Sequence, residues 1–181
     1  RLGLELGLFA SSSWNAGGSW IKPENASQRL LCRQISVTSA GRLQVTIPLP
    51  EGMTARWKDV AVLAVPASGP AVDISERMDS RGRLDWDAPA GGWRIMRFVA
   101  GNTGQMLECP SPNSNGLVID HLSREAAAVD MSYILDRLLS VRKSLDALKT
   151  FMLDSYEVAE AVDWTDDFAE AFRARHGYNP V

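Results

Sequence analysis

The sequence contains few cysteines, no excess of positive charge and no long apolar run. Its two cysteines, Cys32 and Cys109, form neither a zinc-ligand nor a redox motif, so we expect two free thiols. The 19 basic residues are outnumbered by 22 acidic ones, which leaves no basic surface for the phosphates of nucleic acid. No apolar run approaches the roughly 20 residues that a membrane-spanning helix needs. These absences argue against a nucleic-acid-binding or membrane-spanning protein, whereas the 45% hydrophobic content predicts a buried core.

The chain begins with Arg1 instead of Met, and no charged region followed by an apolar stretch marks a signal peptide. A strand-like segment follows within a few residues. We therefore expect this chain to be a piece of a longer polypeptide, and this stretch leaves the location of the parent protein open.

The first 100 residues have the patterns of strands and loops. Alternation predicts a strand over residues 2–9, and the Ser-, Gly- and Asn-rich stretch 11–28 predicts a long loop that holds Trp14 and Trp20. Four further strands are expected in a β-rich block, at residues 30–38, 43–47, 60–65 and 93–99. The Gly-containing turn at 39–42 predicts that the first two of these strands form a hairpin.

After residue 101 the hydrophobic period changes to that of a helix. Ser123 is placed to cap a helix whose apolar positions step by three and four; these are Ala127, Met131, Ile134, Leu138, Val141 and Leu145. An apolar run over 149–154 predicts a buried parallel strand. A second helix is expected from Thr165, with Gly177 beyond its end.

Helix, buried strand, loop and helix in this order are typical of the units of a βα barrel. A whole barrel takes about 250 residues, so only part of one could be present. The sequence thus predicts an α/β fold: a portion of a (β/α) barrel with an inserted β-rich block. We expect the first barrel strand and active-site loop at 1–29, the insertion at 30–100 and the βα units at 101–181.

The strand expected at 149–154 ends in a cluster of acidic, aromatic and hydroxyl side chains that includes Asp154 and Glu157. In α/β barrels the catalytic groups lie at the C-terminal ends of the strands. Glu157 is therefore the candidate catalytic residue. A capped strand end with solvated carboxylates is an equally good interpretation of this segment alone.

Four segments in series resemble glycoside hydrolase family 106, the α-L-rhamnosidase-type glycosidases. They are Gly-Gly-Ser-Trp-Ile-Lys-Pro-Glu at 17–24, Gly-Arg-Leu-Asp-Trp-Asp-Ala-Pro-Ala-Gly at 82–91 with Trp-Arg-Ile-Met-Arg-Phe at 93–98, Gly-Leu-Val-Ile-Asp-His-Leu-Ser at 116–123, and Asp-Ser-Tyr-Glu-Val at 154–158 with Trp-Thr at 164–165. The chain departs from the family pattern at Ser19, Lys22, His121 and the loop of Cys109 and Pro110. Because such positions are expected to touch substrate, the exact sugar and linkage stay open.

The resemblance implies a barrel domain that removes terminal α-L-rhamnose from plant or bacterial glycans, with inversion and with calcium at the active site. It gives no ligand set for the metal. In this interpretation Glu157 is the general acid, and the general base comes from beyond Val181. Inverting glycosidases hold their two carboxyls roughly 6.5 to 9.5 Å apart, and an apolar strand end beside Tyr156 is expected to raise the pKa of Glu157. A secreted or periplasmic parent is expected.

Seven further residues are candidates for substrate binding: Trp14, Trp20, Glu24, Asp120, His121, Asp154 and Tyr156. Each has a structural alternative. The tryptophans could stack on sugar or fix the loop to the core, and the charged residues could bind hydroxyls or a cation or simply cap helices and face solvent. We expect Trp14 or Trp20 and Asp120 to converge with Glu157 on one cleft.

Two other classes of function remain open on the sequence. The first is a non-catalytic carbohydrate-binding module that uses the tryptophan-containing loop, and the second is an inactive structural fragment of a larger enzyme. The oligomeric state is also open. A carbohydrate-binding module would still bind sugar after the loss of Glu157, whereas an enzyme would lose turnover.

Overall fold

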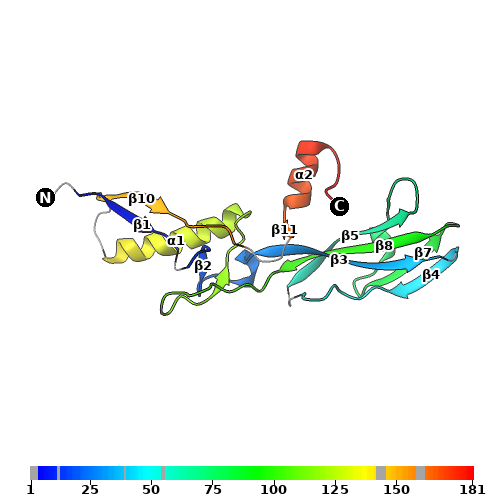
Figure 1. Cartoon of the computed structure of the whole chain (residues 1–181), viewed down its shortest axis with the longest axis horizontal. Helices are drawn as coiled ribbons and strands as arrows, with labels where there is room; N and C mark the ends of the chain where they lie inside the picture. The colour runs from blue at the N-terminus through cyan, green and yellow to red at the C-terminus, as the bar shows by residue number, and fades with distance from the viewer. Residues whose placement is uncertain (1–3, 12, 39, 54–55, 142–145, 158–161) are drawn as a thin grey trace. The chain divides into compact units, whose positions relative to one another are not determined.

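The computed structural model describes residues 4–11, 13–38, 40–53, 56–141, 146–157 and 162–181. The chain forms two compact units: one comprises Arg1–Gln28 and Asn102–Phe168, and the other comprises Arg29–Gly101 and Ala169–Val181. In Figure 1 the elements are labelled in chain order. Within the described ranges, no helix is long and apolar enough to cross a membrane. Cys32 and Cys109 are free, as predicted, and both are exposed.

The first unit contains short strands and the long helix. Strand β1 (Leu6–Phe9) pairs in parallel with β10 (Leu148–Met152), and β2 (Gly17–Gly18) pairs antiparallel with β9 (Leu117–Val118). The 3-10 helix η1 (Pro23–Asn25), helix α1 (Arg124–Val141) and strand β11 (Val162–Trp164) complete it. Its core consists mainly of small residues: Ala16, Ile21, Ala26, Ile119 and Ala126.

Helix α1 begins where its cap was predicted. The Ser123 side-chain oxygen accepts the Ala126 N–H at 3.2 Å, and the helix begins at Arg124. Only Ala126 and Asp130 of this helix are buried, and Leu139 and Val141 are exposed. On the predicted apolar face, Ala127, Met131, Ile134 and Leu138 are half-buried and Val141 is exposed, so the face is only partly covered. Leu145, the last residue of the predicted face, lies outside the described residues.

The second unit is mostly antiparallel sheet. Strands β3 (Gln28–Val37), β8 (Trp93–Asn102), β5 (Trp57–Pro66) and β6 (Val72–Asp73) are neighbours in that order. Strand β4 (Gly41–Thr46) pairs antiparallel with β7 (Arg83–Ala88), and the 3-10 helix η2 (Ser75–Arg77) precedes β7. The predicted hairpin of the first two strands is wrong, because β4 pairs with β7 and β3 lies beside β8 (Figure 1).

The core of this unit follows the period-two alternation of its strands. It contains Val37, Ile47, Val62, Ala64, Ile74, Leu84 and Ile95.

Helix α2 (Phe168–His176) ends as predicted at Gly177, whose φ is +79° and whose N–H donates to the Arg173 carbonyl oxygen at 2.8 Å.

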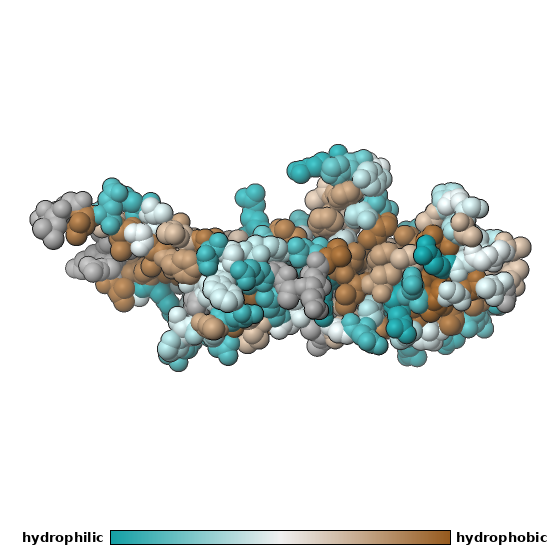
Figure 2. All heavy atoms as spheres, viewed as in Figure 1, coloured by the Kyte–Doolittle hydropathy of each residue, from teal (hydrophilic) through white to brown (hydrophobic). Residues whose placement is uncertain are grey.

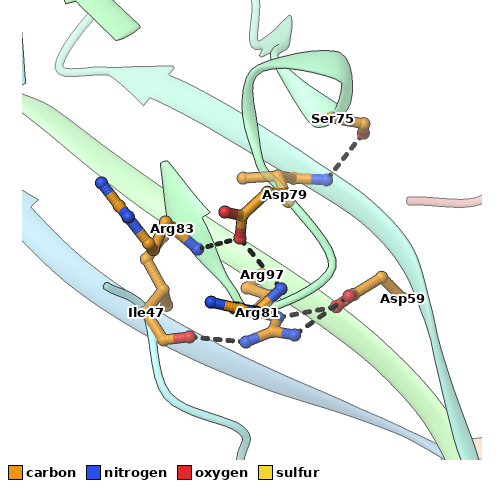
Figure 3. A network of polar contacts seen from close by, with 8 residues as sticks. Ile47, Asp59, Ser75, Asp79, Arg81, Arg83 and Arg97 are labelled. Carbon is orange, nitrogen blue, oxygen red and sulfur yellow. Dashed lines mark hydrogen bonds and ion pairs between the residues drawn. The ribbon is translucent and has the colours of Figure 1, made fainter. Parts of the chain in front are cut away.

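One cation lies inside this core (Figure 3). Arg97 is 2% exposed, and its Nε and Nη2 donate to the two carboxylate oxygens of Asp59 at 2.6 and 2.9 Å. Its Nη1 donates to the Ile47 carbonyl oxygen at 2.5 Å. Gly82, with φ at +78°, leaves room for this guanidinium, because a Cβ there would lie 2.6 Å from Nη1. The buried charge is thus paired and hydrogen-bonded by neighbouring strands.

The predicted portion of a (β/α) barrel is wrong. Most strands pair antiparallel, and the described residues contain two α-helices. The strand predicted at 149–154 does pair in parallel, with β1, but it ends at Met152 and most of its side chains are exposed. Figure 2 shows apolar residues on the surface where Figure 1 draws β1 and β10. An apolar run indicates a strand but does not by itself show that both faces are covered, so the inference of a buried barrel strand failed.

Candidate active site

Glu157 and the other predicted site residues all belong to the first unit. Glu157 follows β10, and its main chain is held by two side chains from distant loops. Its N–H donates to Asn15 Oδ1 at 2.8 Å, and Asn15 Nδ2 donates to its carbonyl oxygen at 2.9 Å. Gln105 Nε2 donates to the same carbonyl oxygen at 2.7 Å. The position of Glu157 is therefore fixed by three hydrogen bonds.

The Glu157 side chain is exposed. The Ser155 hydroxyl donates to Glu157 Oε1 at 2.9 Å. Sequence reasoning predicted an apolar, buried environment, but Met152 and Leu153 are themselves 57% and 59% exposed. In the described part of the chain this carboxyl therefore faces solvent beside one hydroxyl donor.

Trp14 is the tryptophan that lies beside this segment. Its carbonyl oxygen accepts the Ser155 N–H at 3.3 Å, and its side chain is 48% exposed. Hydroxyls fix the loop around it: Ser11 Oγ donates to the Ser13 carbonyl oxygen at 2.6 Å, and Ser13 Oγ donates to the Glu108 carbonyl oxygen. The main chain of Trp14 is thereby held beside Ser155, two residues before Glu157, and the residue is exposed.

Trp20 is held differently. Its indole Nε1 donates to Asp130 Oδ1 at 2.7 Å, and its ring stacks on Tyr133 with centroids 4.0 Å apart. A Cβ on Gly18 would lie 2.4 Å from the Trp20 ring. These contacts join the 11–28 loop to α1, which is the structural role considered for this residue. Substrate contact by Trp20 stays a prediction.

Asp130 is 3% exposed, and burial raises the pKa of its carboxyl, although the Trp20 hydrogen bond acts in the opposite direction. A raised folded-state pKa gives stability that is present at low pH and is lost as pH rises through that pKa. We therefore expect Asp130→Asn, which keeps an oxygen to accept from Trp20, to gain stability relative to the natural protein as pH rises from about 4 to 7. Denaturant unfolding at several pH values measures this.

Asp136→Asn, at an exposed position of the same helix, is the matched control for the substitution, and it is expected to change stability little. If the free energy of unfolding of Asp130→Asn and of the natural protein changed with pH in the same way over this range, the assignment of a buried charge to Asp130 would be contradicted.

Asp120 and Glu24 lie at a second location in the first unit, where both line a cavity. Asp120 is 3% exposed and accepts the Leu122 N–H at 3.0 Å and Gln28 Nε2 at 3.4 Å. Burial raises the pKa of this carboxyl, while the hydrogen bond from the Thr165 side chain lowers it. Both acids line a cavity of about 560 Å³ whose lining does not include Glu157.

His121 and Tyr156 link the loop that carries Asp120 to the segment that carries Glu157. Their rings are in edge contact, with centroids 4.9 Å apart. Burial raises the pKa of the Tyr156 phenol, and its hydrogen bond with Asp163 adds to the rise. Burial also lowers the pKa of the His121 imidazole, whose buried Nδ1 has no hydrogen-bond partner among the described residues. Tyr156 thus packs between the loop after β9 and Asp163, next in sequence to Glu157.

The expected metal has no ligand set in the structure described. No group of three or more His, Cys, Asp or Glu side chains among the described residues could hold an ion. Asp154, the residue considered for calcium or for orienting Glu157, is exposed. The described residues therefore give no ligand set for calcium, which stays a prediction, and we derive no step through it.

Sequence reasoning missed Asn15 and Gln105, the residues that hold Glu157. Asn15 is 6% exposed and lies 142 positions before its partner. A buried loop asparagine has no signature in hydrophobic periodicity. Its partner could be found only once β1 and β10 were known to lie side by side.

Comparison with known proteins supports one family. A protein of Formosa agariphila named "Putative beta-glucuronidase" is 27% identical over 221 residues, covering 100% of this chain and 19% of the relative. The solved structure of a rhamnosidase from Novosphingobium sp. PP1Y has a similar fold, with a TM-score of 0.72 and 16% identity over 99% of this chain and 34% of that one. The chain therefore spans a minor part of each of these proteins.

The family model described as α-L-rhamnosidase matches residues 62–181, a segment that includes Tyr156 and Glu157. This match covers more than half of the chain. It agrees with the resemblance given by the four sequence segments. The chain belongs to the α-L-rhamnosidase family, glycoside hydrolase family 106.

Proposed function

We propose that this chain is part of the catalytic region of a glycosidase that removes terminal α-L-rhamnose from glycans with inversion of configuration. The observation that carries the proposal is the fixed main chain of Glu157 inside the segment matched by the family. A loop carboxyl held by three hydrogen bonds and open to solvent is placed to meet a substrate.

In the proposed reaction, Glu157 in its protonated form donates its proton to the glycosidic oxygen as the bond to the sugar breaks. A second carboxylate deprotonates the water that attacks the opposite face of the sugar, at the roughly 6.5 to 9.5 Å separation typical of inverting enzymes. We propose that this base comes from the remainder of the full-length protein, and we assign it to no described residue.

The exposed Trp14 ring is proposed to stack on the sugar or on the group to which it is linked, because aromatic faces bind the C–H faces of sugars. Tyr156, His121 and Asp120 are proposed to shape the neighbouring surface. Calcium remains a proposed cofactor on the resemblance alone, without assigned ligands.

The experiment is an assay of the full-length protein on an aryl α-L-rhamnoside, with the anomer of the released sugar followed by proton NMR from the first minutes. We expect release of the β-anomer of rhamnose. Release of the α-anomer would contradict inversion, and sugar binding without hydrolysis would favour the carbohydrate-binding module.

A β-glucuronide is the informative second substrate, because the Formosa agariphila relative is named for that activity. We expect hydrolysis of the aryl α-L-rhamnoside and none of the matched aryl β-glucuronide. The reverse preference would support a glycosidase but contradict the proposed α-L-rhamnoside substrate.

A further inference from the structure

Asn15 makes an unusual pair of contacts with Glu157. Its side-chain amide accepts from the N–H and donates to the carbonyl oxygen of the same residue, at 2.8 and 2.9 Å. An adjacent strand would satisfy a main chain in the same way. Beyond the end of β10, the Asn15 side chain therefore makes the two main-chain hydrogen bonds that a neighbouring strand would otherwise make.

The Asn15 side chain is supported by packed structure. Its neighbour Ala16 is 4% exposed in the core of the unit, and the Ala16 carbonyl oxygen accepts the Ile119 N–H at 3.1 Å. The Ser11 hydroxyl, with one proton to donate, lies within hydrogen-bond distance of both the Ser13 and Asn15 carbonyl oxygens. Asn15 is 6% exposed, so its side chain has little freedom to move.

Gln105 supports Glu157 from a second loop. Its side chain donates to the Glu157 carbonyl oxygen at 2.7 Å. Its own main chain is fixed, because its N–H donates to Thr103 Oγ1 at 3.1 Å and its carbonyl oxygen accepts the Val118 N–H at 3.1 Å. Two loops separated by about 90 residues of sequence thus meet at one peptide group.

Apart from Asn15 and Gln105, Tyr156 also holds this segment among the described residues, because its ring packs against His121 and its hydroxyl is hydrogen-bonded with Asp163. The side chains of Met152, Leu153 and Asp154 are exposed, so packing contributes little at these three residues. The Ser155–Trp14 main-chain bond, at 3.3 Å, is the longest of those around it. The main chain of Glu157 itself is thus held by Asn15 and Gln105, while the Ser155 hydroxyl donates to its carboxyl.

We propose that Asn15 and Gln105 are positioning residues that set the main chain of Glu157, so that its carboxyl is aimed at the glycosidic oxygen before substrate binds. The inference rests on the proposed role of Glu157 as general acid. Placement errors of about 1 Å cost up to about 100-fold in rate, so such a support has a measurable kinetic effect. Neither residue touches the reacting atoms in this proposal.

The test is a double-mutant cycle in the full-length protein, with Asn15→Ala, Glu157→Gln and their combination. We expect Asn15→Ala to lower kcat about 10- to 100-fold on a rhamnoside with a poor leaving group and to change KM little. On an activated aryl rhamnoside the loss is expected to be much smaller. In the Glu157→Gln background, adding Asn15→Ala should cost nothing further, because a positioning residue acts only through its partner.

Asn102→Ala is the matched control. Asn102 is also a buried asparagine whose amide donates to main-chain carbonyl oxygens, those of Pro23 and Ala26 at 3.0 and 3.1 Å. The Asn102 amide holds main-chain carbonyls of residues 23 and 26, so Asn102→Ala should lower stability without a dependence on the leaving group. Gln105→Ala, at a half-buried position, is the second variant if Asn15→Ala does not fold; we expect a roughly threefold to tenfold loss of kcat with the same leaving-group dependence.

The outcomes separate the two proposals. If Glu157→Gln shows the leaving-group dependence but Asn15→Ala and Gln105→Ala leave kcat unchanged, the positioning role is overturned and the proposed acid stands. Losses that multiply in the double variant would also overturn it. If Glu157→Gln itself has no such dependence, the proposed acid fails, and the positioning role fails with it.

Discussion

Replacing Glu157 by Gln in the full-length protein is expected to lower turnover by about 10²- to 10⁴-fold on glycosides with poor leaving groups, the range typical of general acid catalysis. The amide cannot donate the proton that such a leaving group requires. Binding should stay near normal, because Gln keeps the shape of the side chain and an oxygen that can accept from the Ser155 hydroxyl. Steady-state kinetics on a natural disaccharide measures kcat and KM separately.

The same variant should lose much less on an activated aryl glycoside, because that leaving group departs without a proton. Asp154→Asn is the matched control, since Asp154 is another exposed carboxylate three residues earlier in the segment. Equal losses of Glu157→Gln on both substrates would mean that Glu157 binds sugar or metal and is not the acid. A loss for Asp154→Asn with the leaving-group dependence expected of Glu157 would transfer the assignment to Asp154.

Local signals in the sequence predicted local structure well. The cap at Ser123 and the glycine after α2 are found as expected, because each depends on residues within one turn of a helix end. Strands in the β-rich block lie close to their predicted ranges, because the period-two alternation is a local pattern. These elements required no knowledge of distant partners.

Pairing between elements was not predictable in the same way. The turn around Gly41 suggested a hairpin, but β4 finds its partner in β7, with Leu43 opposite Trp86. The exposed strand β10 carries the apolar residues of a buried one. Periodicity shows which faces are apolar but not which partner covers them, so the barrel was inferred from a correct strand with an incorrect environment.

In the candidate site, too, local features were predictable and long-range contacts were not. Its position after the predicted strand singled out Glu157, the family resemblance implied its role as general acid, and the structure adds the residues that hold its main chain. Asn15 and Gln105 lie 142 and 52 positions away along the chain. A hydrogen bond over such a separation leaves no trace in a single sequence, because any polar loop residue could make it.

The other large effect is expected on stability. Removal of the Asp59 carboxylate by Asp59→Ala should destabilise the protein by about 3 kcal/mol, because the Arg97 guanidinium would be left buried without its counterion. This is the lower end of the range for a broken buried pair, since the Asp59 side chain is 28% exposed and water can reach the space that it leaves. Denaturant unfolding of the natural protein and the variant measures the difference.

Asp85→Ala is the matched control for this substitution. Asp85 pairs with Arg42 at 2.5 Å in the same unit, but both side chains are largely exposed, at 46% and 70%. Solvent screens that pair, so its removal should change stability little. Replacing both partners of the buried pair, as Asp59→Leu with Arg97→Met, should recover much of the loss, because no uncompensated charge then remains inside. Equal small effects of Asp59→Ala and Asp85→Ala would show that water reaches Arg97 and that its charge is not held by Asp59.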